Sequence, residues 1–507
     1  MTALLAPGYW ALVVIVLLWD VGLGGLMARN RKAPPPFTLL TALAAFLVAP
    51  ALLVAVTAPS LLYGRSILAI AWVWPLTVLV YVAQSAYAVA RRLVTPAIGV
   101  PILVFNVVLA LVEGTRYLLL LGQDVPAPLL ALDNAAAGAV GFALGLSALS
   151  VPFAVLVPML APAYPARYRG SATLRATFAV LAAAFTMMVL GMELPRALRA
   201  QASFAPLARE QLQERPDGGF AVGLRLFPDL HDVPSPPVQR FDLPLVDSLG
   251  VTAVHLVLAP DAARPTPLDS LARLLESIRG DSTTVLVTLS YPANAASRYR
   301  SDPAAFVAQR ALEVHEIVRR LRPEVILPVH EPYGAGERAL GRLPVAAWER
   351  YVTATAAAAK RARPRTRVGL SAASYDARDS ALFAWAAREG SPVDLPGFSL
   401  FPTFDGAVGL RARMAAADRW MRAAPASRRY WVFAAGGYPL RQGDASQRDA
   451  IWGTLAWATG HDRILGLVVA DAGDYERLTG LRGAGGRVRP AAAAVRRAIV
   501  QLGESTQ

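Results

Sequence analysis

The sequence predicts a bundle of six membrane-spanning helices followed by a closed α/β barrel of eight parallel strands, a (β/α)8 or TIM barrel. The first observation is that apolar stretches of about 20 residues recur near the start of the chain, and each is long enough to cross a bilayer. The second is that eight short apolar runs alternate with eight helical patterns between Phe220 and Leu502. Such alternation is typical of a parallel barrel, which needs ~250 residues.

The apolar stretches predict a transmembrane domain over residues 1–193. Residues 194–216 have the pattern of a helical connector, and residues 217–507 then form the barrel domain. We expect the six spans at Tyr9–Met27, Phe37–Val56, Ile67–Ala90, Ile98–Leu121, Ala136–Leu160 and Leu174–Met192.

Positive charge in the loops predicts the orientation of these spans, because loops rich in Lys and Arg stay in the cytoplasm. Three loops are positive, and they follow span one, follow span three and precede span six. Their basic residues are Arg29, Arg31, Lys32, Arg91, Arg92, Arg167, Arg169 and Arg175. The loops between them are poor in positive charge. The chain is therefore expected to be an integral protein of the inner or plasma membrane, with its barrel as an extracytoplasmic, periplasmic domain.

Three polar residues lie inside the predicted spans at similar depth: Asp20, Gln84 and Asn106. Buried polar groups in lipid have partners, so they predict either a hydrogen-bonded cluster that fixes helix packing or a polar site for a headgroup, an ion or a proton. We favour the packing cluster. Glu113 and Arg116 stand three residues apart on one helix and are expected to pair.

The eight apolar runs of the second half predict strands that are buried on both faces. Helical patterns separate them; one of these, Asp302–Leu321, places apolar residues on one face and stops before Pro323. The strands are expected at Phe220–Leu226, Val251–Ala259, Thr283–Leu289, Glu324–Val329, Arg367–Ser371, Leu395–Phe401, Arg429–Ala434 and Ile464–Ala470.

Composition excludes some classes of function. The net charge of +14 comes from arginines scattered along the chain, not massed with aromatic residues, so nucleic acid is not an expected partner. The histidines show no metal-ligand spacing, and we predict neither a metal nor a cofactor. There is no cysteine, and a barrel of this size needs no disulfide.

The fourth predicted strand ends in His330-Glu331-Pro332. This resembles the clan of retaining glycoside hydrolases built on a (β/α)8 barrel, whose fourth strand ends in Asn-Glu-Pro with the Glu as acid/base. The resemblance implies a site at the carboxyl ends of the strands with Glu331 as its catalytic acid.

The chain departs from that clan at strand seven, where the clan places its nucleophilic Glu. The matching position in Phe433-Ala434-Ala435-Gly436-Gly437-Tyr438-Pro439 is Ala435, which cannot act as a nucleophile. His330 also replaces the clan's Asn. A glycosidase needs two carboxyl groups, so the alignment predicts degenerate catalysis, that is, a pseudoenzyme. If Ala435 faces an open mouth, a glutamate there should be tolerated.

Other residues at the strand ends are candidates for the second carboxylate and for sugar contacts. Asp471 directly ends the eighth run and is the first candidate for a catalytic partner of Glu331. Asp376 also has the position of a helix N-cap. The candidate substrate-binding residues are His330, Tyr291, Tyr375, Asp376, Phe401, Asp405 and Tyr438.

We therefore expect a membrane-anchored, extracytoplasmic barrel that is similar to glycoside hydrolases and binds carbohydrate or glycoconjugates at the cell surface. Two alternatives remain open. One is an active glycosidase that uses Glu331 as its acid and an Asp as its partner. The other is a non-catalytic subunit that docks with membrane-protein partners through its spans.

Overall fold

The computed structural model describes residues 7–29, 32–57, 70–121, 123, 125–144, 156–163, 169–215, 219–279, 283–475, 479–483 and 486–504. The chain divides into two compact units. The first comprises residues up to Ala202 together with the short stretch Leu440–Gly443, and the second comprises Ser203–Pro439 and the residues from Asp444 onward.

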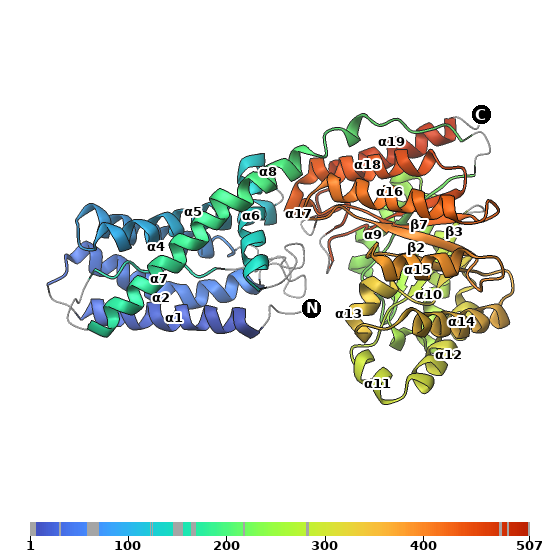
Figure 1. Cartoon of the computed structure of the whole chain (residues 1–507), viewed down its shortest axis with the longest axis horizontal. Helices are drawn as coiled ribbons and strands as arrows, with labels where there is room; N and C mark the ends of the chain where they lie inside the picture. The colour runs from blue at the N-terminus through green and yellow to red at the C-terminus, as the bar shows by residue number, and fades with distance from the viewer. Residues whose placement is uncertain are drawn as a thin grey trace. The chain divides into compact units, whose positions relative to one another are not determined.

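The first unit is helical. Figure 1 shows α1, α2, α4, α5 and α7 running alongside one another, and the pairs α1–α2, α2–α4, α4–α5 and α5–α7 are in contact. The helices are α1 (Pro7–Ala28), α2 (Pro35–Thr57), α4 (Val73–Ala90), α5 (Pro96–Leu120), α6 (Ala127–Leu144), α7 (Arg169–Met187), the π-helical turn η3 (Met188–Glu193) and α8 (Leu194–Ala202).

The expected number of six spans is wrong. Among the described residues, four helical stretches are long and apolar enough to cross a membrane, namely Pro35–Ala55, Val73–Ala90, Pro96–Leu119 and Arg175–Arg209. Val13–Met27 and Ala127–Phe142 are shorter apolar helices. The fifth expected span, Ala136–Leu160, is not one helix, because residues 156–163 form neither helix nor strand. Pro158 and Pro162 explain this, since proline removes a helical hydrogen bond and clashes with the preceding turn.

The three polar residues predicted inside the spans form a hydrogen-bonded cluster, which confirms the packing interpretation. Asp20, Gln84 and Asn106 are completely buried, and each accepts a hydrogen bond from the backbone of the non-helical segment 156–163. The cluster thus joins α1, α4 and α5 to that segment.

The expected pair Glu113–Arg116 is also present, with Arg116 Nη1 3.0 Å from Glu113 Oε1. Arg116 additionally donates from Nε to Asp133 of α6 at 2.6 Å. Asp133 is 3.6 Å from Arg441, which belongs to the stretch Leu440–Gly443 of the same unit. This buried network is larger than the sequence indicated. The negative charges of Glu113 and Asp133 balance the positive charges of Arg116 and Arg441.

The second unit is a closed barrel of eight parallel strands in sequential order, closed by pairing of the first and last strands, which confirms that part of the predicted fold. The strands are β1 (Ala221–Arg225), β2 (Ala253–Leu258), β3 (Thr284–Leu289), β4 (Val325–Leu327), β5 (Arg367–Ala372), β6 (Leu395–Leu400), β7 (Tyr430–Ala435) and β8 (Ile464–Val469). All eight lie within or overlap the apolar runs of the sequence.

Helices surround the strands of this unit (Figure 1). Those that connect successive strands and close the ring are α9 (Pro236–Leu249), α10 (Pro265–Ile278), α12 (Pro303–Leu321), α14 (Val345–Ala362), α15 (Ala377–Ala387), α16 (Ala407–Ala423), α18 (Asp444–Thr459) and α19 (Pro490–Glu504). The shorter elements are η4 (Leu207–Arg209), η5 (Pro260–Ala262), α11 (Ala295–Ser301), η6 (Pro332–Gly336) and α13 (Glu337–Leu340). The short helix α17 (Pro439–Gln442) follows β7 and belongs almost entirely to the first unit.

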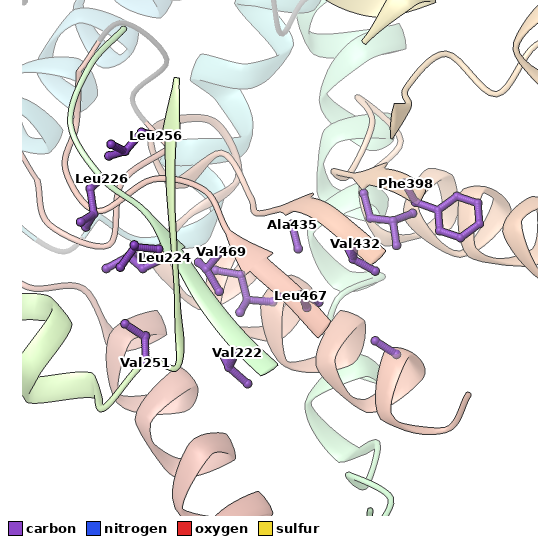
Figure 2. Packing of buried hydrophobic residues seen from close by; sticks show 14 of the residues in the cluster. Val222, Leu224, Leu226, Val251, Leu256, Phe398, Val432, Ala435, Leu467 and Val469 are labelled. Atoms are coloured by element: carbon purple, nitrogen blue, oxygen red, sulfur yellow. The ribbon is translucent and has the colours of Figure 1, made fainter. Parts of the chain in front are cut away.

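Alternation along the strands separates two apolar cores. Outward-facing residues such as Val432 and Leu467 pack with the helices (Figure 2). The inner core contains Trp431 and Phe433 of β7. Their rings need glycine opposite them: a Cβ at Gly369 would lie 2.7 Å from the Phe433 ring. Above these rings, toward the carboxyl ends of the strands, the inward-facing side chains become polar.

Candidate active site at the carboxyl ends of the strands

Five strands place polar side chains on the inner face near their carboxyl ends. They are Arg225 of β1, His255 of β2, Thr288 of β3, Ser371 of β5 and Ser399 of β6. All five are buried. Burying so many polar groups is costly unless they bind one another or a ligand. In (β/α)8 barrels this end carries the active site, so the layer marks the candidate site.

Glu331 follows β4 and its carboxylate joins this layer. Ser399 Oγ donates to Glu331 Oε1 at 2.7 Å, and Ser371 Oγ lies 2.9 Å from Ser399 Oγ. Glu331 is only 9% exposed. A chain of two hydroxyl groups therefore orients the carboxylate from the neighbouring strands.

The backbone at Glu331 is strained, with φ at 45° in the left-handed region. Phe227 and Tyr375, which follow β1 and β5, also have positive φ. Residues other than glycine rarely adopt this backbone conformation, and such strain clusters at functional sites. Gly334 completes the turn, because a Cβ there would lie 2.8 Å from Glu331 Oε2. The local fold is thus built around the position of this one carboxylate.

Asp471, the other predicted acid, follows β8 and is also buried. Arg225 Nε donates to its Oδ1, and Thr479 Oγ1 donates to its Oδ2 at 2.6 Å. The charges of Asp471, Glu331 and Asp229 outweigh the burial of Arg225 and raise the pKa of its guanidinium. Arg225 therefore stays charged between the two buried acids and links them electrostatically.

His255 lies beside Arg225, as the strand register Arg225–His255 requires. Its Nε2 is 2.7 Å from Thr288 Oγ1. Burial, followed by the charges of Arg225 and His330, lowers the pKa of His255 well below its usual value, so the ring is neutral. Its Nδ1 is buried and has no hydrogen-bond partner among the described residues, which makes it a polar atom available to a ligand.

Three predicted binding residues surround Glu331. The Tyr291 hydroxyl donates to the His330 carbonyl oxygen at 3.0 Å, and the Tyr375 hydroxyl donates to the Ser399 carbonyl oxygen at 3.2 Å. Burial raises the pKa of both tyrosines well above the usual value. His330 itself is 6% exposed. The structure places these three residues close to Glu331.

The other predicted residues have different surroundings. Asp376 is the N-cap of α15 and accepts from the amides of Arg378 and Asp379, each at 2.9 Å, so its capping role is confirmed. Asp405 is exposed on the loop after β6. Phe401 and Tyr438 contact each other, with ring centroids 5.8 Å apart.

The proposed alignment of Ala435 with a mouth-facing nucleophile is wrong. Ala435 is completely buried in the outer apolar core, and Figure 2 shows it among apolar side chains that include Val432 and Phe398. The reason is a β-bulge: the pairing shifts so that Ala434 lies opposite Ser399, whose side chain faces inward. The extra residue reverses the alternation, and Ala435 faces the helices.

Sequence reasoning missed Arg225, His255, Ser371 and Ser399 as site residues. A signal was present, because each is a polar residue within a run otherwise buried on both faces. Arg225 in Val222-Gly223-Leu224-Arg225-Leu226 is the clearest case.

Comparison with known proteins gives a fold-level likeness. No family model matches the chain, and no curated protein matches it. Among solved structures it is similar to a β-glucuronidase of Ruminococcus gnavus, with 9% identity, a TM-score of 0.40, and coverage of 55% of this chain and 49% of that chain. The chain thus spans about half the length of that enzyme.

Two further similar structures have higher TM-scores. An exo-β-1,4-mannosidase from an Opitutaceae bacterium gives 14% identity, a TM-score of 0.44, and coverage of 59% of this chain and 62% of that one. GH5_18 from Streptomyces cattleya, solved in complex with GlcNAc, gives 16% identity, a TM-score of 0.45, and coverage of 57% and 82%. All three are glycoside hydrolases, but scores this low carry no argument about activity.

Proposed function

We propose that the barrel binds carbohydrate at the carboxyl ends of its strands, that Glu331 is the main polar contact, and that hydrolysis has been lost. The observation that carries this proposal is the buried carboxylate of Glu331, oriented by Ser399 at 2.7 Å within a layer of polar side chains. Oriented carboxylates and hydroxyl groups are suited to bind sugar hydroxyls. Tyr291 and Tyr375 add aromatic surface beside them.

The loss of hydrolysis is inferred from the second carboxylate. Glycoside hydrolysis requires one acid to protonate the leaving oxygen and another to attack or to activate water. Strand β7 ends in Ala434, Ala435 and Gly436, none of which has a carboxylate. Asp471 already accepts from Arg225 and Thr479 on its two oxygens. An anion held in this way is a weak nucleophile, because the arginine stabilises the charge that attack would consume.

An active glycosidase is the second candidate, and one observation favours it. Arg225 interacts electrostatically with both Glu331 and Asp471, so the site does hold two acids near one cation. In this reading Glu331 protonates the leaving group, and Asp471 acts as the base or nucleophile.

The full-length protein in detergent, applied to a glycan array, tests the proposal. We expect binding to a restricted set of glycans, with affinity reduced about 10- to 100-fold in Glu331→Gln, since a hydrogen bond to a charged group contributes ~1.5–3 kcal/mol. Glu389→Gln is the control, because Glu389 is exposed on a loop at the opposite end of the barrel; its binding should equal that of the wild type.

Activity measurements separate the candidates. Cleavage of an aryl glycoside by the wild type, abolished in both Glu331→Gln and Asp471→Asn, would establish the glycosidase instead. A protein that binds no glycan, cleaves none and purifies with stable membrane partners would support a non-catalytic subunit and overturn both.

The membrane-anchored, extracytoplasmic location is part of the same proposal. It is supported by the four apolar helices and by the arginine-rich loops of the sequence.

A further inference from the structure

The non-helical segment 156–163 lies buried inside the helical unit, which is unusual for irregular backbone. Val157, Met159, Leu160 and Ala161 are at most 5% exposed. In a lipid environment, irregular backbone is tolerated only where protein or enclosed water satisfies its polar groups. Such interrupted helices often form binding sites in membrane proteins.

Side chains from three helices satisfy this backbone at three successive amides. The Met159 amide donates to Asn106 Oδ1 at 2.9 Å, the Leu160 amide to Asp20 Oδ1 at 3.1 Å, and the Ala161 amide to Gln84 Oε1 at 2.9 Å. Pro158 and Pro162 on either side have no amide hydrogen to satisfy.

The three acceptors differ in one respect. Asn106 and Gln84 also donate back to the segment, to the Met159 carbonyl oxygen at 2.8 Å and the Ala161 carbonyl oxygen at 3.0 Å. A carboxylate cannot donate. Asp20 Oδ2 is accordingly buried with the Tyr81 hydroxyl as its polar neighbour, and no hydrogen bond of normal geometry joins the two. An asparagine at position 20 would have met the structural need, so the aspartate calls for a separate explanation.

In the part of the chain that the structure describes, no cationic side chain pairs with Asp20. Its electrostatic neighbours are the Leu160 amide and the Tyr81 hydroxyl of α4, and that hydroxyl is itself buried without a partner of normal geometry. Neither α2 nor the segment 156–163 has an ionisable side chain. Helix α7 contacts the neighbouring Trp19 through Phe178, and its Arg175 forms no ion pair with Asp20. The described residues likewise contain no group of three or more potential metal ligands among His, Cys, Asp and Glu.

We propose that Asp20 is a proton-binding site within the helical unit. A lone carboxylate in an apolar bundle costs several kcal/mol, whereas a protonated carboxyl is neutral. A protonated Asp20 carboxyl also has one hydrogen-bond acceptor and one donor to offer, as the side-chain amides of Asn106 and Gln84 do. The acceptor takes the Leu160 amide, and the proton is donated to the Tyr81 hydroxyl oxygen. Loss of the proton would leave an unpaired charge beside the segment and loosen it.

Infrared spectroscopy of the full-length protein in lipid tests this directly, because a protonated carboxyl has a carbonyl stretch distinct from that of a carboxylate. The measurement is made at about pH 8, where Asp242 and Asp379, whose pKa values are raised to about 6, are ionised. We expect the protonated band in the wild type and its loss in Asp20→Asn. Asp462→Asn, which removes an exposed carboxylate, should retain it.

Identical carbonyl bands in the wild type and in Asp20→Asn would overturn the proposal. Loss of the wild-type band on addition of sodium chloride would also overturn it, because the site would then take a metal cation.

If Asp20→Asn fails to fold, the wild type alone decides the question. Dicyclohexylcarbodiimide modifies protonated carboxyls in apolar surroundings, so peptide mass spectrometry should find Asp20 modified, at a rate that falls as pH rises. An unmodified Asp20 in the detergent-solubilised protein would count against a bound proton.

Discussion

Glu331 and Asp471 are both buried acids at the same end of the barrel, but their neighbours give them different chemistry. Glu331 accepts a hydrogen bond from a serine hydroxyl, which orients its carboxylate. Asp471 is held by an arginine that cancels its charge. The identity of each partner, more than the burial of each acid, sets its role.

Replacing Arg225 by methionine should destabilise the barrel strongly, because Asp471 would remain buried without its cation. The expected loss is ~3–5 kcal/mol. Chemical denaturation of the full-length protein in detergent, followed by tryptophan fluorescence, measures it. The double variant Arg225→Met/Asp471→Asn should recover much of the loss.

Arg320→Met is the matched control for this prediction. Arg320 pairs with Asp269 near the surface, where solvent screens the ion pair, so this variant should lose much less stability than Arg225→Met. Equal losses in the two single variants would show that the Arg225–Asp471 pair is not the buried element described here.

Asp379 should make stability depend on pH. Its Oδ2 accepts from the amides of Ala373, Ser374 and Tyr375 at 2.8–3.0 Å, yet burial dominates and raises the pKa of Asp379 from 3.8 to about 6. The folded state therefore holds the proton more tightly than the unfolded state. The bound proton on Asp379 therefore adds ~3 kcal/mol to the free energy of unfolding. This stabilisation is complete below about pH 4 and is lost as the pH rises to about 6.

Melting curves of the wild type and of Asp379→Asn across this range check the prediction. The wild type should lose stability relative to the variant as the pH rises from about 4 to 6, and the difference should be constant above that. A difference that stays constant over the whole range would contradict the assignment.

Strand β7 shows how one element decides the chemistry of the site. Its bulge shifts the alternation by one residue, so that Ala434 faces the polar layer and Ala435 faces the helices. Sequence alignment with a family motif cannot detect such a shift, because the bulge depends on how β6 and β7 pair.

Ala435→Glu should consequently destabilise the barrel by several kcal/mol, since it buries an unpaired carboxylate in an apolar core. Ala426→Glu is the control, because Ala426 is exposed and the change should stay within about 0.5 kcal/mol. Melting temperatures of both variants in detergent provide the comparison. A stable Ala435→Glu protein would restore the idea that this position faces the mouth.

For the whole molecule, membrane topology is the main open prediction. The arginines before α2, between α4 and α5, and at the start of α7 are all cytoplasmic only if the chain crosses the membrane an even number of times between each pair of these sites. The shorter helix α6 must then cross as well as the four long ones, whereas these sites place no requirement on α1, which precedes them. Reporter fusions after Arg31 and after Glu214 should therefore report opposite sides.

Fusions that report the same side would show that the chain crosses an even number of times between them, as it would if α6 does not cross, and the barrel would then lie on the side of Arg31. This experiment is independent of glycan binding, so it tests the location of the protein separately from its function.

The eight strands were predictable because a strand buried on both faces must be apolar, and an unbroken parallel alternation has few topologies available. Glu331 was predictable because the strand-end position follows from the chain itself. The partners of Glu331 were not: Ser399 lies 68 residues away, and no local pattern links two strands across a barrel.

Sequence by itself thus determined the barrel, the apolar character of the first unit, and the presence of polar residues inside it, because each follows from local hydrophobic patterning. Only the tertiary structure decided which polar groups meet. It paired Arg225 with Asp471, turned Ala435 away from the mouth, and placed Asp20 against the Leu160 amide. These are contacts between segments remote in the chain, and their geometry is set by strand register, by a bulge and by proline-interrupted backbone that packing has to accommodate.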